Sequence, residues 1–155
     1  PEYAKRYAER MKALTERYAD KVGERLVFEL DFSDNRSIWS SDLLITDWSG
    51  ISLEFCFATK RPALFINTKM KVENPNWEKI DCVPVEISLR DRVGIALDMD
   101  ELDRVGKTVR ELLGNPEHYA AKIRQVLDGH FYNLGHAAKA GAVYVLKSLQ
   151  EKRKK

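Results

Sequence analysis

Cysteine, histidine and long apolar runs are all scarce in this sequence. Among the 155 residues only Cys56 and Cys82 are cysteines, and their spacing matches neither a zinc site nor a disulfide scaffold. No apolar run approaches the roughly 20 residues that a membrane-spanning helix needs, and the amino terminus lacks the apolar stretch of a secretory signal. We therefore expect a soluble protein that works in a reducing cytoplasm.

The three histidines, His118, His130 and His136, have no carboxylate or cysteine at a spacing that would complete a metal-ligand set. We predict no metal site and no cofactor. Tyrosines in the first predicted helix recur at the spacing of a packed face, which favours packing over a base-stacking platform for nucleic acid. We therefore expect no nucleic-acid partner.

Charge is nearly balanced, with 26 lysines and arginines against 24 acidic residues. The excess lies in the last four residues, because the rest of the chain holds 22 basic residues against 24 acidic ones. Such a run is usually a solvated helix end. Near an anionic membrane each basic residue would add about 1 kcal/mol of attraction. We expect a basic tail over residues 151–155, with peripheral contact to the inner face of the plasma membrane as the alternative interpretation.

The first half of the chain alternates helical and strand patterns. We predict these elements: an amphipathic helix from Tyr3 to Val22 ended by Gly23, a strand over Arg25–Asp31, a short helix through Trp39 capped by Ser33, Asp34 or Asn35, a strand over 43–46, a helix over 51–58 and a strand over 62–66. The last three make a βαβ unit, whose strands are parallel and whose crossover is right-handed.

The second half is mostly helical. We predict a surface loop over 67–81 that carries Trp77, a short strand over 94–97, a helix capped by Asp98 or Asp100 and closed by Gly114, a helix begun by Asn115 and Pro116 whose inner face is Tyr119, Ile123, Val126 and Leu127, and a last helix from about His136. The fold class is therefore α/β, a Rossmann-like parallel sheet flanked by helices with a helical carboxyl-terminal third. A hydrophobic content of 44% suits one core, so we predict a single domain over 1–150.

Two hydroxyls and a glycine stand between the strand over 43–46 and the helix after it, in the sequence Thr46-Asp47-Trp48-Ser49-Gly50-Ile51-Ser52. The first N–H groups of a helix have no internal partner, so anions such as a diphosphate bind there. Gly50 would let a diphosphate approach the backbone, Ser49 and Ser52 would donate hydroxyls, and Glu54 would accept from a ribose diol.

The simpler interpretation is that Asp47 or Ser49 only caps its own helix, as these residues do in most proteins. Ser49 is a poor candidate for a hydrolase nucleophile, because Asp47 and Ile51 occupy the positions where a nucleophile elbow needs glycine.

The segment SDLLITDWSGISLEFCFATKRPALFI, from Ser41 to Ile66, resembles the donor-site segment of CDP-glycerol glycerophosphotransferases nearly position for position. In that family a strand ending in a Thr-Asp-aromatic-Ser motif leads into a helix and then a Lys-Arg-Pro strand. The resemblance implies that the chain is the carboxyl-terminal, donor-binding part of a glycosyltransferase-B fold. Its implied diphosphate contacts are Thr46, Asp47, Ser49 and Gly50, and its implied ribose contact is Glu54.

This chain departs from the family's pattern at two positions of the donor-site segment. The family often has a second small hydroxyl residue where this chain has Gly50, and Trp48 replaces the commoner tyrosine. The base therefore stays open between cytidine and uridine.

The resemblance further implies a transferase that moves glycerol phosphate, or a similar polyol phosphate, from a CDP-linked donor to a polymer or lipid-linked acceptor of the cell envelope, as in teichoic acid synthesis. Because a complete enzyme of the family also has an acceptor-binding domain, a catalytic base and a His-Pro segment, we expect this chain to be a piece of a longer protein and inactive alone. Two alternatives remain: a UDP-sugar glycosyltransferase or sugar-nucleotide epimerase relative, and a non-catalytic interaction module.

Overall fold

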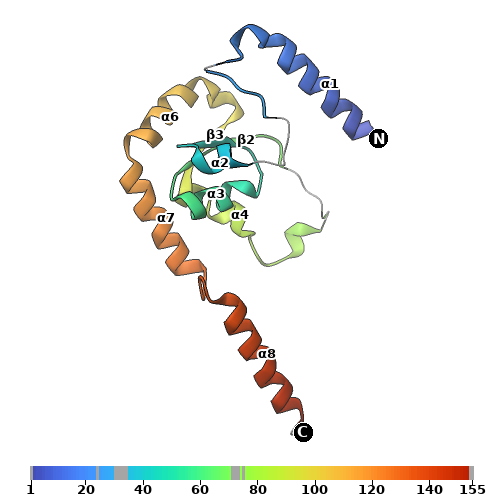
Figure 1. Cartoon of the computed structure of the whole chain (residues 1–155), viewed down its shortest axis with the longest axis vertical. Helices are drawn as coiled ribbons and strands as arrows, with labels where there is room; N and C mark the ends of the chain where they lie inside the picture. Colours follow the sequence, from blue (N-terminus) through green and yellow to red (C-terminus); the bar gives the residue numbers. More distant parts are fainter. Residues whose placement is uncertain (1, 24, 30–34, 71–73, 75, 154–155) are drawn as a thin grey trace. The chain divides into compact units, whose positions relative to one another are not determined.

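A computed structural model describes residues 2–23, 25–29, 35–70, 74 and 76–153 (Figure 1). The chain divides into two compact units, Pro1–Arg36 and Ser37–Lys155, which are described separately. The single domain over 1–150 stays a prediction.

The first unit is built on the predicted amphipathic helix. Helix α1 spans Glu2–Arg17, which confirms a helix here, but it ends at Arg17 and not at Gly23; the 3-10 turn η1 follows at Ala19–Lys21. The predicted strand over 25–31 is wrong for residues 25–29, which have no regular structure, and its last two residues lie outside the described part. Among the described residues this run has no neighbouring strand, and an apolar run without a ladder partner cannot satisfy its backbone as a strand.

The second unit is built on a parallel sheet of three strands: β1 (Leu44–Thr46), β2 (Ala63–Asn67) and β3 (Gly94–Asp98), in the order β1-β2-β3. Both strand pairs are parallel. Helix α3 (Ile51–Thr59) connects β1 to β2, so the predicted βαβ unit is confirmed. The predicted third strand over 94–97 is confirmed as well.

Both faces of the central strand β2 are covered, which is why it reads as a continuous apolar run, whereas Ile45 of the edge strand β1 is 50% exposed. On one face Phe65 packs in a buried cluster with α3 and with the inner side of α7. On the other face Leu64 and Leu97 pack with Leu112 and Tyr119. Because successive residues of a strand point to opposite faces, β2 supplies both clusters and is the centre of the unit.

The remaining elements of this unit are helical (Figure 1): α2 (Arg36–Ser40, which begins at the end of the first unit), η2 (Trp77–Lys79), α4 (Val85–Ser88), α5 (Arg90–Val93), η3 (Met99–Arg104), α6 (Val105–Gly114), α7 (Pro116–His130) and α8 (Ala137–Arg153). Asp98 caps η3 in a capping box with Glu101, as predicted for this aspartate. Pro116 begins α7, whose four predicted core residues are all buried. Candidate caps Ser33 and Asp34 lie outside the described residues.

The predicted loop after β2 is largely irregular. The loop predicted over 67–81 contains the short turn η2, and its Trp77 is 38% exposed. Within the described residues no helix is both long and apolar enough to cross a membrane.

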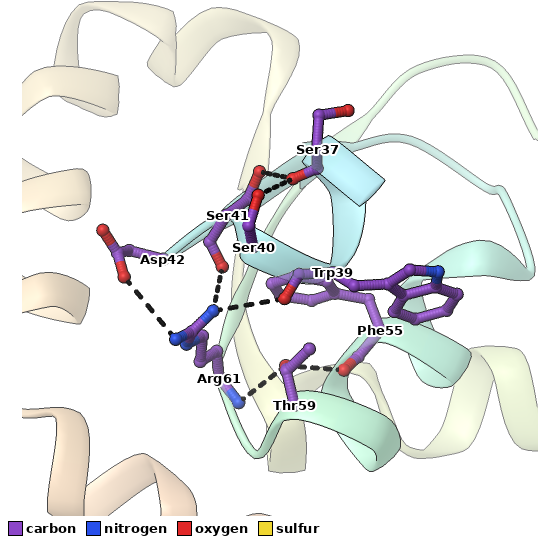
Figure 2. A network of polar contacts seen from close by, with 8 residues as sticks. All are labelled: Ser37, Trp39, Ser40, Ser41, Asp42, Phe55, Thr59 and Arg61. Carbon is purple, nitrogen blue, oxygen red and sulfur yellow. Dashed lines mark hydrogen bonds and ion pairs between the residues drawn. The ribbon is translucent and has the colours of Figure 1, made fainter. Parts of the chain in front are cut away.

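Arg61 fastens the start of β2 to the segment that precedes β1 (Figure 2). Its guanidinium donates to the carbonyl oxygen of Ser41 at 2.8 Å and to that of Trp39 at 3.4 Å. It also lies 3.9 Å from the Asp42 carboxylate, and its backbone N–H donates to the Thr59 hydroxyl at 3.1 Å. These contacts hold the edge of the sheet where the strands begin, opposite to the edge where they end.

The two cysteines differ in reactivity because only one is exposed. Burial raises the pKa of the Cys56 thiol to about 12, so this thiol keeps its proton, whereas Cys82 is exposed. We expect a maleimide or disulfide reagent at pH 8 to modify one thiol per native chain and two per denatured chain. Since an unfolded thiol ionises near 9.0, the Cys56 contribution to the free energy of unfolding falls as pH rises from 9.0 toward 12. Rapid modification of both thiols in the native protein would contradict this burial.

Candidate functional site

The three strands end at one edge of the sheet, because all are parallel. Their last residues are Thr46, Asn67 and Asp98. From Thr46 the chain turns through residues 47–50 into α3, so this turn lies at the carboxyl edge. Open α/β sheets bind their ligands at this edge.

The amino end of α3 is open. Its first backbone hydrogen bonds run from Ser52 to the carbonyl of Ser49, at 3.3 Å, and from Leu53 to the carbonyl of Gly50, at 3.2 Å. Within the described part of the chain, the N–H groups of residues 48–51 donate to no acceptor. No side chain caps the helix either. The capping interpretation of Asp47 and Ser49 is therefore wrong, and four successive donors have no acceptor in the described chain; Ser49 and Gly50 are exposed, and Trp48 and Ile51 are half-buried.

Gly50 leaves open space beside these N–H groups. Its φ of −61° and ψ of −24° are helical values that any residue can adopt, and an added Cβ would meet no atom within 4 Å. Neither backbone conformation nor packing requires a glycine here. The missing side chain leaves the amino end of α3 accessible from solvent.

Most of the predicted site residues meet in this turn. Thr46 is half-buried, whereas Asp47, Ser49 and Gly50 are exposed. Glu54 is exposed on α3, four residues after Gly50 and therefore on the same side of the helix. Ser52 differs, because it is only 2% exposed and its hydroxyl donates to the carbonyl of Ser49 at 2.9 Å. That hydroxyl holds the helix start together.

Arg90 lies against this turn and was not recognised in the sequence. It belongs to the four-residue helix α5 and is only 5% exposed. Its guanidinium donates to the carbonyl of Asp47 at 3.1 Å and to Oδ1 of Asn67 at 2.8 Å. The same group lies 3.9 Å from the ring centroid of Trp48 and 4.5 Å from that of Phe65.

Further polar contacts join the three strand ends. Nδ2 of Asn67 donates to the Asp98 carboxylate at 2.7 Å, so β2 is tied to β3 beyond their ladder. The indole N–H of Trp48 donates to the carbonyl of Thr68 at 2.7 Å. The turn is thus fixed both to the end of β2 and to α5.

A buried cation, Arg90, lies at this edge together with the carboxylates of Asp47 and Asp91. Burial lowers the pKa of the Arg90 guanidinium from its ordinary value, and the carboxylates of Asp91 and Asp47 act in the opposite direction. Arginine nevertheless stays charged at every physiological pH. A positive charge therefore lies beneath the open amides of the turn.

A cavity of about 160 Å³ adjoins the turn and has Arg90 in its wall. Its lining residues are Trp48, Ser49, Met70, Pro84, Glu86, Ile87 and Arg90. The wall combines apolar side chains with the Ser49 hydroxyl, the Arg90 guanidinium and the Glu86 carboxylate. With one cation and one carboxylate, this wall has no net preference for an anion.

Among the residues that the structure describes, no three histidine, cysteine or acidic side chains gather as a metal site would require. His130 contacts the Arg92 guanidinium and the carbonyl of Val126, both at 3.1 Å, which are contacts at a helix end.

Comparisons with known proteins give no match: no family model, no curated protein and no solved structure resembles this chain closely enough to be identified with it. The resemblance of the segment 41–66 therefore stays a prediction from its own residues. The functional argument depends on the geometry of the turn.

Proposed function

We propose that this chain is the donor-nucleotide-binding part of a transferase similar to the CDP-glycerol glycerophosphotransferases. The turn of residues 46–50 and the amino end of α3 hold the diphosphate of the donor. One observation carries this proposal: the N–H groups of residues 48–51 are unpaired in the described chain at an exposed helix start, at the carboxyl edge of a parallel sheet.

Each residue of the turn has a part in the proposal. Backbone N–H groups donate to phosphate oxygens, and the positive end of the α3 dipole favours their charge. The hydroxyls of Ser49 and Thr46 add donors. Asp47 contributes indirectly, because its backbone carbonyl accepts from Arg90 at 3.1 Å and so fixes the turn, whereas its carboxylate has the same charge as phosphate. Glu54, on the same side of α3, accepts from the ribose diol.

The reaction is transfer of glycerol phosphate, or a similar polyol phosphate, to a cell-envelope polymer at the cytoplasmic face of the membrane. Donors held at the diphosphate stabilise the charge that develops on the departing nucleoside monophosphate. The acceptor site and the catalytic base belong to a part of the enzyme outside this chain. The basic end of α8 contacts the anionic membrane surface in this proposal.

Calorimetry with CDP, UDP and their glycerol and sugar conjugates tests the proposal. We expect millimolar or tighter binding of CDP conjugates by the wild-type chain. Preference for UDP conjugates would favour a UDP-sugar transferase or epimerase relative instead. Absence of heat at millimolar concentrations of every ligand would favour the interaction module.

The double substitution Ser49→Ala with Glu54→Ala should weaken CDP-glycerol binding by about 30-fold, because it removes one phosphate donor and the ribose acceptor. A matched control changes the same residue types on α8, Ser148→Ala with Glu151→Ala. Equal affinities of the two double variants, with unchanged thermal unfolding, would show that the nucleotide binds elsewhere.

A further inference from the structure

The contacts of Arg90 go beyond what burial of a cation requires. Two of its N–H groups donate to two different segments, the carbonyl of Asp47 in the turn and the side chain of Asn67 at the end of β2. Its central carbon lies over the ring of Trp48, 3.9 Å from the ring centroid. Three contacts of one rigid group therefore define where the turn lies relative to the sheet.

We infer that Arg90 is a positioning residue, which holds the turn of residues 46–50 in the conformation that exposes its backbone donors to a diphosphate. This inference rests on the proposed function for its ligand. It does not make Arg90 a phosphate ligand, because the guanidinium already donates to the carbonyl of Asp47 and to the side chain of Asn67.

The geometry of one peptide unit explains how Arg90, bound to the carbonyl of Asp47, orients the N–H of Trp48. The peptide unit between Asp47 and Trp48 is planar, and no cis peptide occurs among the described residues. In a trans unit the carbonyl and the N–H point in opposite directions. Since Arg90 draws the carbonyl of Asp47 toward itself, the N–H of Trp48 faces away from the guanidinium, where it has no acceptor in the described chain.

The planar shape of the Arg90 guanidinium matters for positioning the turn as well as its charge. A guanidinium presents several donors in a rigid plane and stacks on aromatic rings, whereas an ammonium is a compact point charge. Only the planar group reaches Asp47 and Asn67 together while it lies over Trp48. Lysine at position 90 would keep the charge and lose this arrangement.

The arrangement also reaches the third strand. Asn67 accepts from Arg90 through Oδ1 and donates through Nδ2 to the carboxylate of Asp98. These two bonds fix the orientation of the Asn67 amide, because its oxygen then accepts from a donor and its nitrogen donates to an acceptor. Arg90 therefore joins the turn to the ends of β2 and β3.

Two readouts test the inference on Arg90→Met and Arg90→Lys. The first needs no ligand: hydrogen exchange of the Trp48 indole N–H, which donates to the carbonyl of Thr68, followed by NMR. We expect exchange at least about 10-fold faster in both variants. The second is the dissociation constant of inorganic pyrophosphate, which should rise about 10-fold in both.

The control is Arg92→Met, which removes an exposed arginine from the same short helix and should leave both readouts unchanged. Full retention of both readouts in Arg90→Lys would overturn the inference, because charge alone would then suffice. Unchanged indole exchange in Arg90→Met would overturn it as well. Should Arg90→Met not fold, as judged by circular dichroism, Arg90→Lys carries the same test.

The two proposals fail in different ways. If wild-type protein does not bind pyrophosphate or CDP, the proposed function fails, while indole exchange still decides whether Arg90 holds the turn. If wild-type protein binds both ligands and the Arg90 variants bind equally well, only the positioning role fails.

Discussion

Replacing Gly94 with alanine should destabilise the fold by about 3 kcal/mol or more. Gly94 begins β3 and is paired with Ala63 of β2. A Cβ at this position would lie 1.8 Å from the carbonyl oxygen of Ala63, a backbone atom that cannot move aside without breaking the ladder. The backbone of Gly94 is extended, so the effect is steric. Urea unfolding of both proteins, followed by circular dichroism, measures it.

Gly129→Ala is the matched control, because Gly129 lies within α7 and an added Cβ would meet no atom within 4 Å. Alanine should stabilise the helix there by about 0.5–1 kcal/mol. The two substitutions add the same methyl group with opposite expected signs. A Gly94→Ala variant as stable as the wild type would mean that β3 does not approach β2 as described.

Gly50→Asp should abolish nucleotide binding and leave the fold intact. A carboxylate at the start of α3 would occupy the space that the phosphates need, and like charges in contact cost several kcal/mol. We expect CDP affinity to fall at least about 100-fold. The fold should be as stable or more stable, because residue 50 has a helical backbone, its surroundings are open, and an acidic residue favours a helix amino end. Calorimetry and thermal unfolding of the same sample give both values.

Gly50→Asn separates charge from bulk, since asparagine has nearly the shape of aspartate without its charge. We expect its affinity to lie between those of the wild type and Gly50→Asp. Equal CDP affinity in wild type and Gly50→Asp would contradict any anion site at this helix end.

Much of the sheet could be predicted because its strands are continuous apolar runs bounded by turn residues. The runs around Leu44 and Leu64, with the buried helix between them, allow only a βαβ connection, and the structure has it. The run at 25–29 also has an apolar centre, Leu26 to Phe28, but it has no partner strand within the described residues, and composition cannot show whether a partner exists. The glycosyltransferase-B assignment goes beyond what three strands define.

The candidate site was only partly predictable, for a physical reason. The residues of the turn are contiguous, so helix-end chemistry identified them together. Arg90 lies more than 40 residues from Asp47 in sequence, in a helix of four residues that gives no periodic signal. Asn67 and Asp98 could have been found, because each ends a predicted parallel strand and the carboxyl ends of such strands meet at one edge. The burial of Ser52 depends on helix packing, which the local sequence does not specify.

The most direct test of the account is an amide-resolved titration of the chain with CDP, by ¹H–¹⁵N correlation NMR. Phosphate oxygens that accept from the backbone change the chemical shifts of the amides that donate to them. The account predicts that the largest shifts fall on residues 48–51 and saturate by millimolar CDP. Shifts absent at that concentration, or centred on other residues, would contradict it.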